Sequence, residues 1–422
     1  MLPFVLLLVA PVRGSTVASG AGVQWPSPGP CRAAHGADRR DSVAQAASRD
    51  ALLRRLMPAL WSNAYGGVTV GLRAPPACTA PAERGWFLAS AATRSGATSA
   101  VGLYARWNSP PIGLGRRAAT SVAAWSVEGR TGGAIALDRS LQQSRGVGAD
   151  RHIGIGALWM ATTNLAYLDR RLWDDAGSIE ITPWISTAVR HGATVLRARG
   201  TASVGLVYRH ATPLSASGRS YHYRGFNRVT GEVSVRTPVA RATTFGARVF
   251  GGAYLGPSTP VRQLRVGVAG ADPYQTFANP FLRSRGALLV RPDFYYQAPG
   301  GPNLRAFRND LGGRWAVGVN LELAQAVMRR DAGLVREVAL EGFVDLGVVD
   351  TLAVPSSPPS QWYTTLYDGG VGIVTRHQLK DLDWTMRFEA PLAVNRWSQA
   401  ADYPSSHTRF ALRWQVSFSP SF

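Results

Sequence analysis

The chain has 422 residues, of which 45 are glycine and 17% are charged, below the roughly 25% of an average soluble protein. Its net charge of +20 comes almost entirely from arginine, because Lys380 is the only lysine. The arginines are spread singly along the chain, whereas binding of nucleic-acid phosphates uses basic residues gathered on one element. Nucleic-acid binding is therefore not expected. The mean hydropathy is -0.05, and no apolar run reaches the about 18 residues of a membrane helix.

The first 20 residues form a signal-like apolar segment. Residues 1–12 are apolar but too short to span a bilayer, and small residues follow around Ala18. This pattern resembles a secretory signal peptide that lacks its usual basic start. Residues 21–61 then predict a linker rich in Pro, Gly and Ala and a short amphipathic helix between Asp41 and Leu60, where apolar residues recur at helical spacing.

The residue types that carry catalytic or metal chemistry are scattered. Cys31 and Cys78 match neither a zinc site nor a CxxC redox motif; either they form one disulfide in an oxidising compartment, or both are unpaired thiols. The seven histidines show no metal-ligand spacing. No HExxH, GxSxG, Walker A or GxGxxG motif stands in a suitable context. We therefore expect no cofactor, no metal and no enzymatic activity.

From residue 62 to residue 422 the hydrophobic period is two. Leu103 and Ala105, for example, alternate with Gly102, Tyr104 and Arg106. A soluble sandwich would share this period, but the segments are about 10 residues long, which is the length of a tilted membrane strand. We therefore predict an all-β fold, a transmembrane antiparallel β-barrel of about 16 strands with a hydrated polar lumen. Tryptophans near predicted strand ends would form its interfacial girdles: Trp86, Trp107, Trp184, Trp315 and Trp384.

The last predicted strand has the clearest alternation. Its apolar residues fall on even positions and end in a carboxy-terminal phenylalanine; they include Phe410, Trp414, Phe418 and Phe422. This pattern resembles the β-signal by which bacterial outer-membrane barrels are recognised for insertion. A soluble edge strand this long and apolar would be prone to aggregation. The sequence therefore predicts integral localisation in the bacterial outer membrane.

Two motifs resemble the superfamily of BamA-type bacterial surface antigens and two-partner-secretion transporters. The first resembles the Gly-Gly-x-x-x-(Val/Ile)-Arg-Gly-(Tyr/Phe) motif of the sixth external loop, with Leu304 replacing Val/Ile and Ala306 replacing Gly. Its residues are Gly300, Gly301, Leu304, Arg305, Ala306 and Phe307. The second matches the Phe-x-Asp-x-Gly motif of the thirteenth strand, with residues Phe343, Asp345 and Gly347. The resemblance is firm over residues 290–422 and architectural over 62–290.

The strands predicted after the loop motif agree with this resemblance. Residues 368–372 are similar to the family's next glycine-rich strand, and residues 387–392 are similar to its penultimate strand. Five strands are expected after the loop, the number found in a 16-stranded member: 313–326, 335–347, 366–376, 382–393 and 408–420.

The resemblance also implies a contact inside the barrel. The family folds its sixth loop back into the lumen, where Arg305 would meet Asp345 in a charge-assisted pair. On the thirteenth strand Val338, Leu340 and Val344 would face lipid, so that the alternate residues Glu337, Glu341, Phe343 and Asp345 would point into the lumen. We interpret Glu337 and Glu341 as lumen-lining charges. A positive φ at Ala306, if the family's glycine has one, would strain the alanine.

Three functions compete at this point. The first is a barrel that assists outer-membrane protein assembly or translocation, whose partners would be outer-membrane lipid and unfolded outer-membrane proteins or a secreted passenger. The second is a membrane anchor or pore, including the C-terminal half of a split metallopeptidase-barrel fusion, because residues 61–73 resemble the first barrel strand of such fusions. The third, a diffusion porin, fits the alternation but not the paired motifs. About 60 residues before the barrel are too few for a string of periplasmic domains, which weakens the first.

Overall fold

The computed structural model describes most of the predicted barrel and none of the first 55 residues. The described ranges are 56–63, 67–74, 85–92, 101–108, 118–127, 129–143, 148–164, 173–210, 221–256, 260–270, 295–297, 300–308, 310–350, 363–379, 382–396 and 415–420. The signal-like segment, Cys31 and Cys78, and the residues Phe410, Trp414 and Phe422 lie outside these ranges. So do residues 41–55 of the predicted helix.

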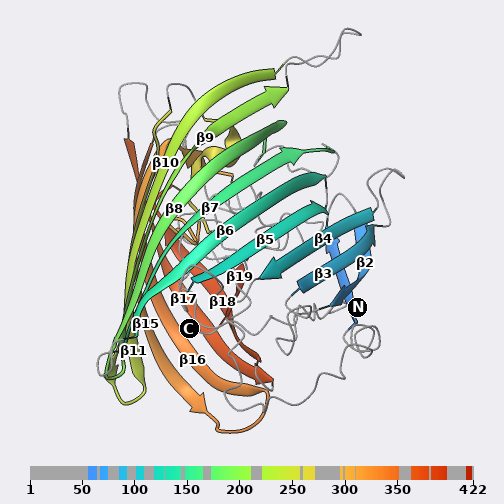
Figure 1. Ribbon diagram of the computed structural model, residues 1–422. Coiled ribbons are helices and arrows are strands. Elements are labelled where there is room, and N and C mark those ends of the chain that lie inside the picture. The colour runs from blue at the N-terminus through green and yellow to red at the C-terminus, as the bar shows by residue number, and fades with distance from the viewer. Residues whose placement is uncertain are drawn as a thin grey trace.

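Strands dominate the described chain, and most of them belong to one large sheet (Figure 1). The first eleven are β1 (Met57–Asn63), β2 (Gly67–Ala74), β3 (Gly85–Ala92), β4 (Val101–Asn108), β5 (Ala118–Val127), β6 (Arg130–Gln143), β7 (Gly148–Thr162), β8 (Ala176–His191), β9 (Thr194–His210), β10 (Tyr221–Ala240) and β11 (Thr243–Tyr254). The last five are β15 (Trp315–Arg329), β16 (Val335–Asp350), β17 (Tyr363–Leu379), β18 (Leu382–Val394) and β19 (Gln415–Pro420). The connection between β11 and β15 contains the 3-10 helix η4 (Arg262–Leu264) and the short strands β12 (Val266–Gly267), β13 (Tyr295–Gln297) and β14 (Gly312–Gly313).

The sixteen strands β1–β11 and β15–β19 pair antiparallel in chain order. This confirms the predicted all-β antiparallel architecture and the predicted number of strands. β16 is the thirteenth strand of the series, as its motif implied. In the described part of the chain, β1 pairs with β2 alone, whereas β19 pairs with β18 and with β13. No described ladder therefore joins the first strand to the last.

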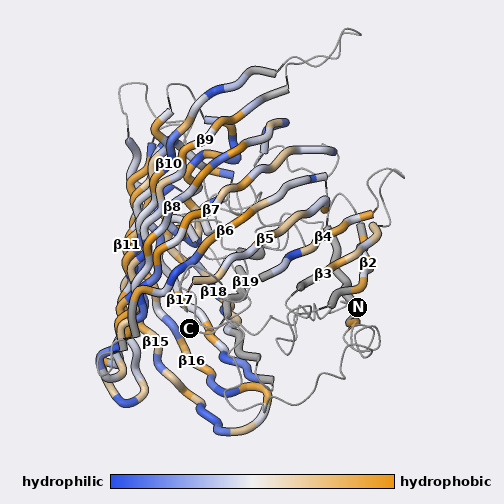
Figure 2. Tube along the Cα trace, in the orientation of Figure 1, coloured by the Kyte–Doolittle hydropathy of each residue, from blue (hydrophilic) through white to orange (hydrophobic). Residues whose placement is uncertain are grey.

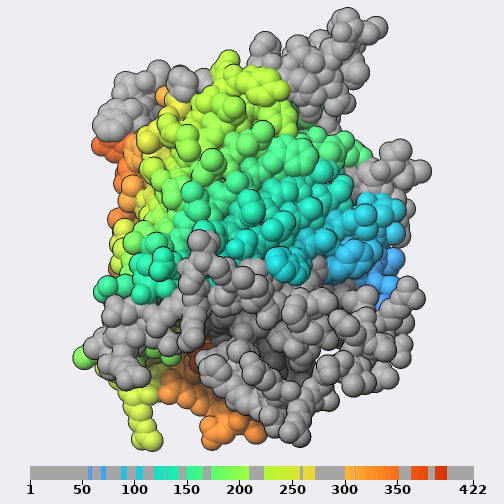
Figure 3. Space-filling model, in the orientation of Figure 1, coloured from blue at the N-terminus to red at the C-terminus, as the bar shows by residue number. Residues whose placement is uncertain are grey.

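The two faces of the sheet differ in the way the alternation predicts. On β4, Leu103 is 50% exposed and Trp107 is 43% exposed, whereas Tyr104 and Arg106 are buried. Figure 2 shows the same alternation of apolar and polar residues along neighbouring strands. The outer faces of β5–β10 form a continuous wall (Figure 3). Large aliphatic side chains exposed over most of the strands give this outer surface the apolar character that a lipid-facing wall requires.

The inner face is less polar than the sequence indicated. Leu88, Trp125, Met160, Val207 and Phe226 belong to a cluster of buried side chains. Val261 and Leu264, from the connection between β11 and β15, pack into the same cluster. Part of the expected hydrated polar lumen is therefore apolar, because part of this connection lies inside the curved sheet and buries inner-face apolar side chains that alternation alone assigns to water.

Two local predictions also fail. Met57–Leu60, expected at the end of a helix, lie in β1, and the sheet begins at Met57 rather than at residue 62. The cause is lateral pairing, because these residues take their backbone partners from Arg73–Val70 of β2.

Trp184 was expected in an interfacial girdle but lies in mid-strand on the same face as the buried Glu180. Its ring covers Gly154 of β7, where a Cβ would lie 2.1 Å from the indole. Among the described residues, no helix is long and apolar enough to cross a membrane.

Candidate functional site

The loop motif lies in a segment that folds inward from the rim of the sheet. β12 and β14 form a two-stranded sheet at its base. The Leu304 N–H donates to the Val268 carbonyl at 2.9 Å, and the Val268 N–H donates to the Leu311 carbonyl at 3.1 Å. Leu304, Ala306 and Phe307 are all buried in a second apolar cluster, which also contains Val349 and Leu366 of the strand wall. We call residues 300–311 the plug segment.

A tight turn leads into the plug segment. Gly301 has φ +52°, and a Cβ there would lie 2.9 Å from the Gly270 carbonyl oxygen, so glycine is required on both counts. Asn303 also has a positive φ, 55°, a conformation that asparagine tolerates better than most residues. Ala306 is not among the described residues with positive φ, so the replacement of the family's glycine does not strain the backbone.

Two strand glycines form the seat of the plug segment. Gly318 of β15 and Gly347 of β16 are direct partners across the ladder. A Cβ on Gly318 would lie 2.7 Å from the Cβ of Pro302, and a Cβ on Gly347 would lie 2.7 Å from Cδ1 of Leu304. The motif glycine Gly347 therefore leaves room for the motif leucine. On the neighbouring strand, Gly318 leaves room for Pro302 in the same way.

Polar side chains from the wall hold the backbone of the turn. The Asn320 amide nitrogen donates to the carbonyls of Pro302 and Asn303 at 3.0 and 3.2 Å and to Oδ1 of Asp345 at 2.9 Å. Arg248 donates to the Gly301 carbonyl at 2.7 Å and to the Asn320 side-chain oxygen at 2.9 Å. The turn carbonyls thus have fixed donors in a buried position, where an unmade hydrogen bond would be costly.

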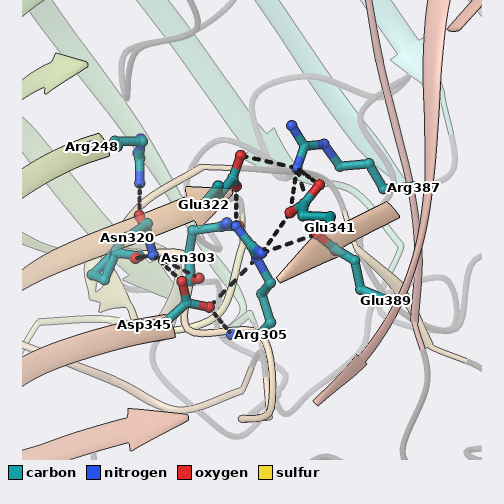
Figure 4. Close-up of polar contacts among 10 residues, drawn as sticks. Arg248, Asn303, Arg305, Asn320, Glu322, Glu341, Asp345, Arg387 and Glu389 are labelled. Carbon is teal, nitrogen blue, oxygen red and sulfur yellow. Dashed lines mark hydrogen bonds and ion pairs between the residues drawn. The ribbon is translucent and has the colours of Figure 1, made fainter. Parts of the chain in front are cut away.

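Arg305 projects from the plug segment into a group of carboxylates (Figure 4). Its side chain is 1% exposed. Its guanidinium lies 3.5 Å from Asp345, 3.1 Å from Glu341 and 3.2 Å from Glu389, and it also contacts Glu322. The Arg305 backbone N–H donates to the same Asp345 oxygen at 3.3 Å. The predicted pair of Arg305 and Asp345 is therefore present, as one contact of a larger cluster supplied by β15, β16 and β18.

Two further groups complete this cluster. The Arg387 guanidinium donates to both oxygens of Glu341 at 2.9 Å and lies 3.2 Å from Glu322. Asp368 of β17, 2% exposed, stands directly opposite Asp345 in the ladder. The cluster thus contains five carboxyl groups and two guanidinium groups. We call it the Arg305 cluster.

The aromatic residue of the strand motif also contacts Arg305. The Arg305 guanidinium carbon lies 4.2 Å from the centre of the Phe343 ring, which gives a cation-π contact on a desolvated face. Burial alone would lower the pKa of Arg305, but Asp345, Glu389, Glu322 and Glu341 raise it well above its ordinary value. Arg305 therefore remains charged although it is enclosed.

The strand motif and its neighbouring glutamates differ in what they contact. Phe343, Asp345 and Gly347 all face the plug segment, and Glu341 joins the cluster, whereas Glu337 pairs separately with Arg329 at 3.1 Å. Sequence reasoning gave no role to Gly318, Asn320 and Glu322. It placed Arg387 and Glu389 in a strand similar to the family's penultimate one but not in this cluster. A usable signal existed for Asn320 and Glu322, because both alternate along the strand with the exposed residues Leu321 and Leu323 and so occupy inner-face positions.

A second attachment holds the other end of the β11–β15 connection. Gln263 of η4 accepts from the Asp174 N–H at 3.0 Å and donates to the Asp174 carbonyl at 3.2 Å. The Asp174 carboxylate accepts from the Arg262 N–H at 2.9 Å. Gln263 is 3% exposed. Two separate contact sets therefore tie this connection to the sheet, one on the loop before β8 and one on β15–β18.

The described residues contain no group of three or more His, Cys, Asp or Glu side chains arranged to hold a metal ion. The carboxylates of the Arg305 cluster are arranged around guanidinium groups instead. Such an arrangement fixes the position of a segment by charge and hydrogen bonding.

Comparisons with known proteins give distant structural likenesses. No protein-family profile and no curated protein sequence matches the chain. The crystal structure of BamA from Haemophilus ducreyi lacking POTRA domains 1-3 is 10% identical with a TM-score of 0.46, over 86% of this chain and 70% of that one.

Two CdiB structures are also similar. CdiB from Acinetobacter baumannii is 12% identical with a TM-score of 0.43, over 86% of this chain and 58% of that one. CdiB from Escherichia coli is 10% identical with a TM-score of 0.40, over 83% and 52%. The chain thus spans less than two thirds of either CdiB.

Proposed function

We propose that this chain is an integral outer-membrane β-barrel that helps other proteins fold into or cross the outer membrane, with its lumen closed at rest by the plug segment. The observation that carries the proposal is the Arg305 cluster. A loop whose only task was to connect β11 to β15 would not need a buried arginine held by four carboxylates. Such a cluster is specific for one arrangement of loop and wall.

Two other features support the proposal. The outer face is apolar over most strands, as contact with lipid requires. The described residues of β1 and β19 do not pair with each other, which leaves a seam between the ends of the sheet. The partners proposed are outer-membrane lipid and either unfolded outer-membrane proteins or a secreted passenger. This role requires no enzymatic chemistry and no cofactor.

A reconstitution experiment tests the assembly role. The purified barrel is inserted into liposomes, a urea-denatured outer-membrane protein is added, and its folding is followed by heat-modifiable gel migration. We expect faster folding than in empty liposomes, and a loss of this acceleration for Arg305→Ala but not for Glu337→Gln, which alters a carboxylate of the same strand outside the cluster. Equal rates with and without the barrel would contradict the assembly role.

A membrane-anchor function is the second candidate. The apolar cluster on the inner face of β3–β10, with Val261 and Leu264 packed into it, favours an anchor over an open pore, because such packing excludes water. An anchor for a separate periplasmic or surface module needs a stable barrel and no moving plug. If the reconstituted chain accelerates no folding and Arg305→Ala changes only its stability, the anchor becomes the better assignment.

A further inference from the structure

Arginines gather on the inner face of β8–β10, close to the short turns that join β8 to β9 and β10 to β11. Residues 192–193 and 241–242 form these turns, and the short turns of an outer-membrane barrel face the periplasm. Leu196 and Val233 are exposed at alternate positions of β9 and β10, so the arginines point to the inner face. We call this group the arginine patch, and its members are Arg190, Arg197, Arg199 and Arg236.

Strand register brings the members of the patch together. Val195 of β9 pairs with Arg190 of β8 on one side and with Arg236 of β10 on the other. Arg197 lies two residues farther along β9 on the same face, and diagonal neighbours in a sheet are about 7–8 Å apart, within reach of long side chains. Arg190 and Arg236 accordingly both repel Arg197. Like charges held this close cost free energy unless an anion lies between them.

The carboxylates near the patch are held by other cations. Glu232 stands opposite Arg199 in the ladder but lies 2.7 Å from the Arg248 guanidinium. Asp138 and Asp150, on the inner face of β6 and β7, contact the two ring nitrogens of His152 at 2.9 and 2.8 Å.

Two members of the patch keep their charge available. In the described part of the chain, Arg190 and Arg236 form no ion pair, and both are exposed. The patch is therefore a cationic surface that a ligand can reach.

The patch also lies next to the Arg305 cluster. Arg236 is repelled by Arg387 of that cluster (Figure 4) and attracted by Glu322. Arg376 of β17 repels Arg236 as well. It alternates with the exposed Ile373 and Val371, so it points into the lumen from the other side of the curved sheet. The space between the plug segment and the short-turn end is thus lined by cations from both sides.

We infer that the arginine patch binds an acidic peptide segment that enters the lumen from the short-turn end. Guanidinium groups bind carboxylates through two parallel hydrogen bonds. Alternate residues of an extended chain are about 6.4–6.8 Å apart. This is the spacing of Arg197 and Arg199 along β9, so carboxylates at every second position of a peptide meet successive arginines. Lipid head groups are not the ligand, because the patch is on the face opposite the exposed aliphatic residues.

This inference rests on the proposed function and deepens it, because it names the chemistry of the segment that the barrel receives. A peptide held by the patch would lie directly against the Arg305 cluster, before the plug segment. The barrel would therefore select client segments by their negative charge before any of them passes the plug.

A binding measurement with the full chain in detergent tests the inference. The probe is a short fluorescein-labelled peptide with aspartate at every second position and serine between, and binding is followed by fluorescence anisotropy. The same peptide with asparagine in place of aspartate is the uncharged control, and inorganic phosphate is the competing small anion. The test variant combines Arg190→Gln with Arg236→Gln. Its matched control combines Arg139→Gln with Arg151→Gln, which removes the same charge from exposed positions on the outer face of β6 and β7.

We expect the aspartate peptide to bind the native chain and the outer-face control equally. The test variant should bind it at least about tenfold more weakly, as loss of one charge-assisted hydrogen bond allows. No binding to the native chain, equal binding of the asparagine peptide, or the same loss in the outer-face control would overturn the inference. Displacement by phosphate at an equal concentration of charged groups would overturn the choice of a peptide as the ligand.

Two further readings keep the result interpretable. Heat-modifiable gel migration confirms that each variant is folded. The assay contains neither a bilayer nor a folding client, so a barrel that accelerates folding in liposomes but does not bind the aspartate peptide refutes this inference alone. A barrel that binds the peptide but accelerates no folding refutes the assembly role instead.

Discussion

The coupling between Arg305 and Asp345 can be predicted in some detail. Arg305→Ala removes one of the two guanidinium groups of the Arg305 cluster and leaves its five carboxyl groups with Arg387 as the remaining cation. The Arg305 and Asp345 side chains are 1% and 0% exposed, so little water is available to screen the difference. Removing one partner of a buried ion pair costs about 3–5 kcal/mol. We expect Arg305→Ala to lower the free energy of unfolding by about this amount.

The effect of Asp345→Asn should depend on whether Arg305 is present. In the native chain the substitution weakens charge-assisted bonds to Arg305 and should cost about 1.5–3 kcal/mol. In the Arg305→Ala background it changes a buried carboxyl group whose guanidinium partner is already gone, so that it should cost less than about 0.5 kcal/mol or stabilise the fold. The resulting coupling energy is about 1.5–3 kcal/mol.

The measurement is a double-mutant cycle on the folded barrel in detergent, with urea unfolding followed by tryptophan fluorescence and gel migration. Glu337→Gln is the control, because Glu337 pairs with the half-exposed Arg329, and exposed pairs contribute about 0–1 kcal/mol. It should be additive with Arg305→Ala. Additivity of Asp345→Asn with Arg305→Ala to within about 0.5 kcal/mol would refute the cluster as a coupled unit.

Three further results are expected. Gly318→Ala should displace the plug segment, because its Cβ would meet rigid Pro302 atoms at 2.7–2.9 Å, whereas Gly342→Ala on β16 meets nothing within 4 Å; limited proteolysis of the loop compares the two, and equal cleavage would argue against the seat. Gln263→Ala removes the two hydrogen bonds that this side chain makes with the Asp174 backbone and should lower the free energy of unfolding by about 1–3 kcal/mol; an unchanged value in urea unfolding would argue against this attachment. Replacing Phe422 with a charged residue should reduce insertion into the outer membrane without reducing synthesis, as surface labelling against total protein would show.

The sequence alone determined the architecture of this protein. A period of two over segments of membrane-strand length leads to antiparallel strands with one apolar face, and the positions near 335–347 and 382–393 fall within β16 and β18. The two motifs also predicted that Arg305 and Asp345 would meet. The strands could be read because side-chain alternation is a local property of an extended chain, whereas the contact of Arg305 with Asp345 was implied by the resemblance of the two motifs to a known family.

The tertiary structure alone decided what surrounds Arg305. Glu322, Glu341 and Glu389 come from three strands, and their convergence depends on strand register and on the curvature of the sheet, which no short pattern encodes. The same holds for Gly318, which is needed only because Pro302 packs against it in the folded chain. Backbone pairing with β2 places Met57–Leu60 in a strand despite their helical spacing. The inward connection between β11 and β15 makes part of the expected polar lumen apolar. In each case a contact between residues distant in sequence outweighed a local preference, because burial and hydrogen bonding are satisfied only in the assembled sheet.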